Sequence, residues 1–136
     1  MPVTYQIDAG SRLIRTRCTG QVTLQEVVDH FRELEQDPAC PDRPRVFLDL
    51  SEVDSLPEPV QLGAVIQELE RIRPRVRFDA CAILATRDAL FGMMRMFEAL
   101  SDSYFRVTRT FRVAGEAEAW LAAQQAPPAS RGKTGG

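Results

Sequence analysis

Apolar and polar residues change their spacing several times along the chain, and each spacing predicts a structural element. Val3, Tyr5 and Ile7 alternate with polar neighbours, which is the period-two pattern of a half-buried strand. The turn residues DAGS separate this segment from the apolar–polar segment RLIRTRCTG. Residues 3–8 and 12–20 are therefore predicted to form a β-hairpin.

A helical repeat follows in TLQEVVDHFRELEQDP. Thr23 and Glu26 have the spacing of a capping box, in which each side chain accepts a hydrogen bond from the other residue's backbone N–H. Apolar residues then recur every three or four positions, at Leu24, Val27, Val28, Phe31 and Leu34. Pro38 ends the predicted helix.

Two short apolar runs show no alternation: VFLDL at 46–50 and ACAILA at 80–85. Continuous runs of this length are typical of parallel strands that are covered on both faces. The apolar face of a helix lies between them, at Leu62, Val65, Ile66, Leu69 and Ile72. Pro74 ends that helix. A strand, a helix and a strand in this order predict a right-handed crossover, with the two runs at the centre of a parallel sheet.

The last third of the chain predicts two more helices and an outer strand. Thr86 is expected to cap a helix over 88–101, and YFRVTRTFRV alternates as an outer strand of the sheet. The final helix, EAEAWLAAQQ, is expected to pack through its Ala, Trp and Leu residues. From Ala126 onward the Pro-, Gly- and Ser-rich composition predicts a disordered tail.

Together these patterns predict one α/β domain over residues 1–125 and a tail over 126–136. The expected order is ββαβαβαβα. The sheet is mixed but mostly parallel, it begins with an antiparallel hairpin, and helices cover it.

Composition narrows the class of protein. A chain of 136 residues with 44% hydrophobic and 26% charged residues fits one globular domain, and no apolar run reaches the length of a membrane span. The first residues, MPVTYQID, lack the pattern of a secretory signal, so the cytoplasm is the expected compartment. All but Lys133 of the 17 basic residues are arginine, yet the net charge is −2. Base composition of the genome explains the arginines better than a nucleic-acid surface does.

Cysteine and histidine offer little for metal or nucleophile chemistry. The three cysteines are an odd number without CxxC spacing, which argues against a disulfide framework and a thiolate metal site. His30 is the only histidine, at the margin of an apolar stripe, so any zinc site or Ser–His pair would depend on it. No cofactor or metal is predicted.

The carboxyl ends of the two central strands form the predicted partner-binding rim, because ligands of open α/β sheets bind beyond these ends. The rim collects acids, hydroxyls and one guanidinium, from Asp49, Ser51, Asp54, Ser55, Glu58, Thr86, Arg87 and Asp88. A purely structural explanation competes, in which Thr86 and Asp88 cap a helix and backbone N–H groups hold Asp49.

The helix over 88–101 carries more apolar residues than one buried stripe needs. Leu90, Met94 and Phe97 would fill that stripe, with Met93 and Leu100, whereas Phe91 and Met96 project away from it. Phe91, Met93 and Met96 are therefore predicted as an apolar surface. Its cover is extra core, a homodimer partner, another protein or an apolar ligand.

Two stretches resemble a known family. VFLDLSEVD is similar to the central strand of the bacterial SpoIIAA-like, or STAS/SEC14-type, domains, and FRVAGEAEAWL is similar to their last strand and helix. The resemblance covers residues 3–123 and implies the STAS fold and a regulatory, protein-binding role. The SEC14 part implies a lipid or apolar ligand.

The phosphorylated motif of the STAS phosphoswitch branch, Asp-Ser-Ser/Thr-Gly, is absent. LPEPV occupies its place, with Glu58 near the position of the serine. The resemblance does not transfer the phosphosite to Ser51 or Ser55. Glu58 is expected to form a capping box with Ser55, the alternative being a permanent negative charge at a helix N-terminus.

The leading hypothesis is thus a non-catalytic protein-interaction or regulatory module, with an unidentified protein partner or a second copy of the chain. The alternative is a carrier of an apolar small molecule or lipid. A third hypothesis, an enzyme that uses Asp49 or Asp88, lacks an accompanying nucleophile, metal triad or cofactor fingerprint.

Overall fold

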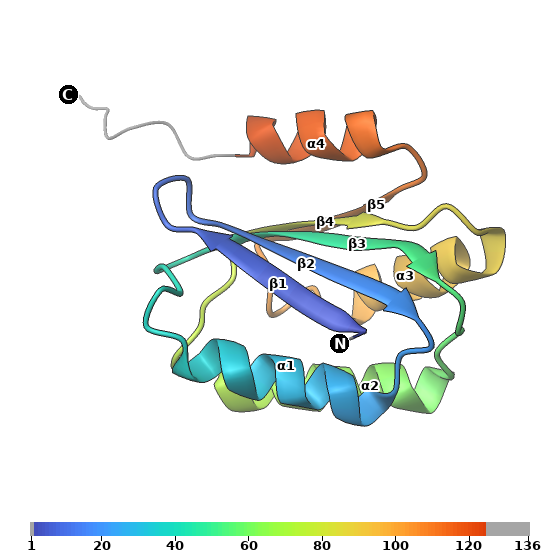
Figure 1. Ribbon diagram of the computed structural model, residues 1–136, viewed down its shortest axis with the longest axis horizontal. Coiled ribbons are helices and arrows are strands. Elements are labelled where there is room, and N and C mark those ends of the chain that lie inside the picture. The colour runs from blue at the N-terminus through green and yellow to red at the C-terminus, as the bar shows by residue number, and fades with distance from the viewer. Residues whose placement is uncertain (1, 125–136) are drawn as a thin grey trace.

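The structure, a computed structural model, describes residues 2–124, which follow the predicted order of strands and helices (Figure 1). The strands are β1 (Val3–Asp8), β2 (Leu13–Gly20), β3 (Arg45–Val53), β4 (Ala80–Leu84) and β5 (Val107–Phe111). The helices are α1 (Leu24–Gln36), α2 (Pro59–Ile72), α3 (Asp88–Leu100) and α4 (Ala114–Ala123). The tail predicted over 126–136 lies outside the described residues.

The strands form one five-stranded sheet in the order β1-β2-β3-β4-β5. β1 and β2 pair antiparallel, and every other pair is parallel, so the predicted mixed α/β sheet is confirmed. In the central pair Val46 lies opposite Cys81 and Asp49 opposite Leu84. The carboxyl ends of β3 and β4 consequently meet at the same edge of the sheet.

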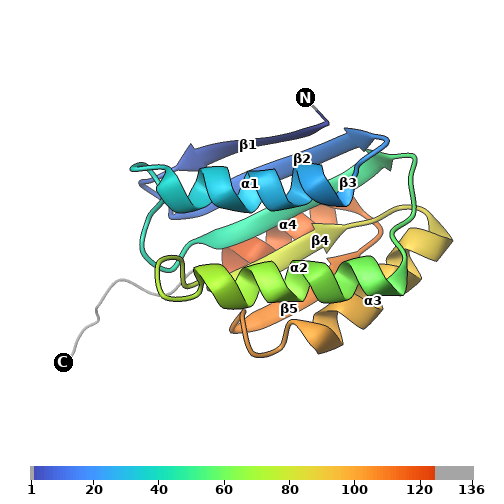
Figure 2. The ribbon, with the colours of Figure 1, turned by 90° about the horizontal axis from the view of Figure 1, so that it is seen from below.

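The helices divide unequally between the two faces of the sheet (Figures 1 and 2). Each parallel connection joins neighbouring strands, and right-handed crossovers in one direction place α1, α2 and α3 on the same face. α4 follows β5 and packs on the opposite face, against β3, β4 and β5. Below, these are called the three-helix face and the α4 face.

Side chains of β3 and β4 alternate between these faces. Val46, Leu50 and Ile83 belong to the core on the three-helix face, whereas Phe47 and Leu84 belong to the core on the α4 face. The second core combines small and large residues: Ala80 and Ala82 of β4 and Ala117 of α4 are fully buried, together with Phe47, Leu84 and Leu121. Small side chains between a strand and a helix let the two backbones approach closely.

Local details differ from the sequence prediction at both ends of α3. The predicted capping box of α1 is present, but the N-cap of α3 is Arg87, not Thr86, and no side chain caps that end. Leu100 is 46% exposed instead of buried, because the buried stripe of α3 runs through Leu90, Met94 and Phe97 to Ser101 and leaves Leu100 on its flank.

A buried arginine ties the amino end of the sheet to α4. Arg45 is 6% exposed and donates hydrogen bonds to the Leu121 carbonyl oxygen at 2.8 Å and the Ser11 carbonyl oxygen at 2.9 Å. Leu121 lies in the last turn of α4, and its carbonyl oxygen also accepts a hydrogen bond from the Gln124 N–H at 3.1 Å. Arg45 thus adds a second hydrogen bond at the end of α4, and burial lowers the pKa of its guanidinium.

Within residues 2–124, the helices are too short or too polar to cross a lipid bilayer.

Candidate binding site between the sheet and helices α1 to α3

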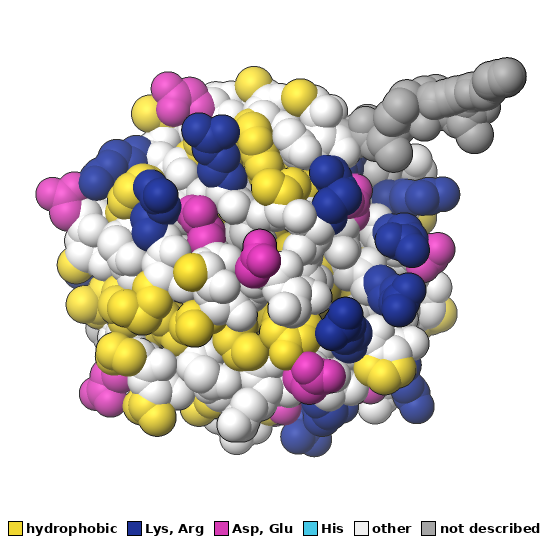
Figure 3. Space-filling model, turned by 180° about the vertical axis from the view of Figure 1, so that it is seen from behind, with side chains coloured by type: hydrophobic (Ala, Val, Ile, Leu, Met, Phe, Trp, Pro, Cys, Tyr) yellow, Lys and Arg dark blue, Asp and Glu magenta, His cyan; other side chains and the backbone are white. Residues whose placement is uncertain are grey.

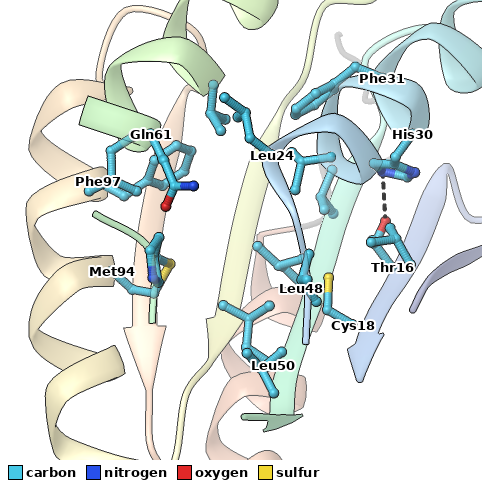
Figure 4. Close-up of a pocket in the computed structure, with 18 of the residues that line it drawn as sticks. Thr16, Cys18, Leu24, His30, Phe31, Leu48, Leu50, Gln61, Met94 and Phe97 are labelled. Carbon is cyan, nitrogen blue, oxygen red and sulfur yellow. Dashed lines mark hydrogen bonds between the residues drawn. The ribbon is translucent and has the colours of Figure 1, made fainter. Parts of the chain in front are cut away.

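A cavity of about 180 Å³ lies on the three-helix face, between the sheet and the helices. The strands contribute Ile14, Cys18, Val46, Leu48, Leu50 and Cys81 to its wall. The helices contribute Leu24, Val27, Phe31, Val65, Met94 and Phe97. Figure 4 shows Cys18, Leu48 and Leu50 of the strands and Leu24, Phe31, Met94 and Phe97 of the helices around this space. The wall is thus almost entirely apolar.

Leu48 marks the incomplete packing of this face. It lies in β3, the central strand, yet it stays half-buried while Val46 and Leu50 on either side of it are buried. Val27 of α1 and Val65 of α2, which also line the cavity, are half-buried as well. Short β-branched side chains at these positions leave space that the helices do not fill.

Thr16 and His30 form one polar pair in the wall. The His30 Nε2 atom lies 3.4 Å from the Thr16 Oγ1 atom, and the imidazole stands edge-on to the Tyr5 ring at 5.2 Å between centroids. Burial lowers the pKa of His30 to about 4. The imidazole is therefore neutral at pH 7 and suits an apolar wall.

The polar end of the cavity, defined here as Thr23, Ser55 and Gln61, lies at the carboxyl ends of β2 and β3. The Ser55 Oγ atom accepts a hydrogen bond from the Val22 N–H at 3.1 Å and joins the loops before α1 and α2. Gln61 Oε1 accepts from the Glu58 N–H at 2.8 Å. The predicted capping box between Ser55 and Glu58 is therefore wrong: α2 begins one residue after Glu58, which pairs with Gln61 instead.

Two cysteines in the cavity wall are held as thiols. Burial raises the pKa of Cys18 to about 11 and the pKa of Cys81 to about 12. Both side chains are apolar contacts at neutral pH, since the thiolate is the nucleophilic form.

Some residues of the predicted rim lie on the α4 face, and others lie beside the cavity. Asp49 and Ser51 point to the α4 face, away from the cavity, and Asp49 Oδ1 accepts from the Ser51 hydroxyl at 2.6 Å and the Ser51 N–H at 2.9 Å. This is the backbone-held carboxylate of the structural explanation. Ser55, by contrast, lines the cavity, and Glu58 is the N-cap of the helix beside it.

The remaining rim residues join neighbouring loops. Arg87 donates to the Val53 carbonyl oxygen at 2.9 Å, which links the ends of β3 and β4, and the Asp54 N–H donates to the Gly20 carbonyl oxygen at 2.9 Å. Asp88 pairs with Arg112, and Thr86 is exposed. Arg87 and Asp54 thus connect the loops that follow neighbouring parallel strands. Partner binding there stays a prediction.

The three residues predicted as an apolar surface on α3 differ in exposure. Met96 is 44% exposed. Met93 is half-buried against the core, and Phe91 is covered by the Arg112 guanidinium, 4.2 Å from its ring centroid. Figure 3 shows apolar side chains gathered in a band on this side of the molecule. The exposed large apolar side chains of α3 are Met96 and Leu100.

The sequence prediction did not identify the cavity. His30 was expected only at the boundary of an apolar stripe, and Gln61 precedes Leu62, the first residue of the predicted apolar face of α2, without any special pattern. The one available signal was the position of both polar side chains at the margin of otherwise apolar helical stripes.

Comparison with known proteins identifies the fold. No family model matches the chain, and a search of curated proteins finds no match. Among solved structures, the chain is similar to an uncharacterised protein of the DUF3478 family from Shewanella loihica PV-4, described as having a SpoIIAA-like fold. The TM-score is 0.57 at 13% identity, over 88% of this chain and 91% of the other. The chain therefore has a SpoIIAA-like fold, as the resemblance implied.

Proposed function

We propose that this chain is a non-catalytic binding module whose cavity holds an apolar small molecule. The observation that supports this proposal is the cavity of about 180 Å³ with an almost entirely apolar wall. An engineered apolar cavity of roughly 150 Å³ in another protein stays dry and binds benzene. The space here suits one aromatic ring with a small substituent, or a short aliphatic chain.

The expected affinity follows from the area that such a ligand buries. A ring-sized group buries about 150–250 Å² of apolar surface, worth about 4–6 kcal/mol at roughly 25 cal/mol per Å². This corresponds to a Kd of about 0.04–1 mM for the ring alone. Leu48, Val27 and Val65 would lose their remaining exposure at the same time.

The ionisation of the wall favours binding over covalent chemistry. The raised pKa values keep Cys18 and Cys81 protonated, and the lowered pKa keeps His30 neutral and hydrogen-bonded to Thr16. A thiol with a raised pKa is a weak nucleophile, and a neutral imidazole with a pKa near 4 is a weak base at pH 7.

An NMR titration with toluene tests the proposal. Backbone amide signals of β2, β3, α1 and α2 should shift and saturate, whereas those of α4 should stay unchanged. Leu48→Phe places a ring in the cavity and should abolish the shifts. Val113→Phe adds the same ring at a position that is 52% exposed and should leave them intact. Unsaturable shifts, or equal shifts in the Leu48→Phe variant, would contradict the proposal.

A protein-interaction or regulatory module is the second candidate, and it is favoured by the exposed side chains of Met96 and Leu100 on α3. These residues lie one turn apart, so they form a continuous apolar strip. The expected partner is another protein or a second copy of the chain. If a second copy binds there, light scattering should show a dimer that Met96→Glu dissociates; a monomer at all concentrations would contradict self-association.

A further inference from the structure

We infer that the cavity selects an uncharged molecule that carries one hydrogen-bond acceptor, such as a carbonyl oxygen, and that Gln61 binds this acceptor. The inference rests on the proposed function, because it names the class of ligand for the same cavity. Three features of the polar end support it: the charge of the lining, the carboxylates at the two helix N-termini, and the free donors of Gln61.

The lining residues carry no formal charge at neutral pH. They are apolar side chains, hydroxyls, thiols, one amide and the neutral imidazole of His30. A ligand with a carboxylate or ammonium group would therefore lose its hydration without gaining an ionic partner in the wall. Burial of an unpaired charge is strongly unfavourable.

Both helix N-termini at the polar end already have a carboxylate. In α1, Glu26 Oε1 accepts from the Thr23 N–H at 2.8 Å and from the Thr23 hydroxyl at 3.0 Å. In α2, the N-cap residue is Glu58. Helix N-termini attract anions through their partial positive charge, but these acidic side chains already offset it. A second anion at the polar end meets repulsion, which disfavours a fatty acid or an aromatic acid.

The Gln61 amide supplies the donors. The Glu58 backbone N–H can only donate, so the atom that receives it at 2.8 Å is the amide oxygen, and the amide nitrogen must occupy the other position. Figure 4 shows Gln61 reaching into the space beside Met94, across from Thr16 and His30. Ser55 adds a second donor, because its oxygen accepts from Val22 while its hydroxyl hydrogen remains available.

These donors discriminate among uncharged ligands as well. A pure hydrocarbon that covers the polar end would remove water from the Gln61 N–H groups without replacing the hydrogen bond. An acceptor oxygen on the ligand restores that bond. Because donors point into the site, a cationic group is also disfavoured there.

The test compares acetophenone, ethylbenzene and benzoate, which share a ring and differ in the polar group. NMR titration of the full chain at pH 7.5 should show benzoate binding at least about tenfold more weakly than acetophenone. Gln61→Glu keeps an acceptor for the Glu58 N–H but removes the donors. It should weaken acetophenone about 5–10-fold, the value of one hydrogen bond, and leave ethylbenzene within about twofold.

Gln61→Lys supplies the missing cation and should tighten benzoate by about tenfold or more. Equal affinities of acetophenone and benzoate in the unmodified chain would overturn the charge selection, whatever the variants do. Equal losses of acetophenone and ethylbenzene in Gln61→Glu would overturn the role of Gln61. Either result would leave the proposed function unaffected. If none of the three probes bound saturably, both the proposed function and this inference would be wrong.

Discussion

The two faces of the sheet differ in how completely their side chains fill the space beside the strands. On the α4 face, alanines of β4 and α4 meet with no exposed surface left, and one short helix covers its part of the sheet. On the three-helix face, larger side chains leave a cavity of about 180 Å³ and a half-buried leucine in the central strand. The comparison shows that the α4 face is filled by its own side chains, whereas the three-helix face leaves the space in which we propose that a ligand binds.

Truncation of a leucine should give the largest change in the free energy of unfolding. The size of this change should differ between the two faces of the sheet. Leu121 is 1% exposed on the α4 face, so Leu121→Ala should lower the free energy of unfolding by about 3 kcal/mol. Leu48→Ala removes a side chain that already borders empty space and should cost about 1–2 kcal/mol. Urea denaturation measures both values; equal losses would remove the distinction between the faces.

Enlarging a side chain should also change the free energy of unfolding differently on the two faces. Ala82 is 0% exposed between β3, β5 and α4, so Ala82→Leu overpacks the core and should cost about 2 kcal/mol. Leu48→Phe should keep the unfolding free energy within about 1 kcal/mol of the original, because the ring enters existing space. A strong destabilisation by Leu48→Phe would show that the space is too small or wrongly placed.

His30 should make stability depend on pH on the three-helix face. Its pKa is about 4 in the folded chain against 6.5 in the unfolded chain, so the unfolded state binds the proton more readily. The contribution is fully present above pH 6.5 and is lost as the pH falls toward 4, by up to about 2 kcal/mol at pH 5.

The measurement is the unfolding free energy at pH 7 and at pH 5, in the original chain and in His30→Gln. Glutamine retains a hydrogen-bonding group beside Thr16 but does not titrate. The difference between the two proteins should change with pH by the predicted amount. If the difference in unfolding free energy were the same at both pH values, His30 would be exposed to water and would not be part of the cavity wall.

The smallest effect is expected from the ion pair that joins β2 to α4. Arg15 forms hydrogen bonds to both Glu118 oxygens at 2.8 and 2.9 Å, but both side chains are nearly half exposed. Glu118→Gln should therefore cost about 0.5 kcal/mol and less in high salt. A loss above about 2 kcal/mol would mean that the α4 face depends on charge as much as on close packing.

The sequence predicted most of the fold because local patterns determine it. Continuous apolar runs identified β3 and β4, and the Thr23–Glu26 spacing identified the start of α1. Arg45 was read only as part of the arginine-rich composition, since its burial depends on a carbonyl 76 residues away. Such long-range contacts leave no local pattern.

The candidate site was less predictable for a related reason. Val27 and Val65 have the spacing of ordinary core residues, and nothing in that spacing records how far the helices stand from the sheet. Thr86 and Arg87 can each precede a helix in extended conformation, so the cap of α3 was misplaced by one residue. The carboxyl ends of β3 and β4 meet at one edge because parallel strands fix them there, and the role of the rim at that edge stays a prediction.

Xenon binding measures the central claim most directly, since xenon enters apolar cavities without any polar contact. In NMR spectra recorded under xenon pressure, we predict saturable shifts for residues that line the cavity, including Leu48, Val27 and Val65, and unchanged signals for α4. Leu48→Phe should remove the shifts. Absence of saturable shifts in the original chain, or shifts of equal size on both faces of the sheet, would contradict the account.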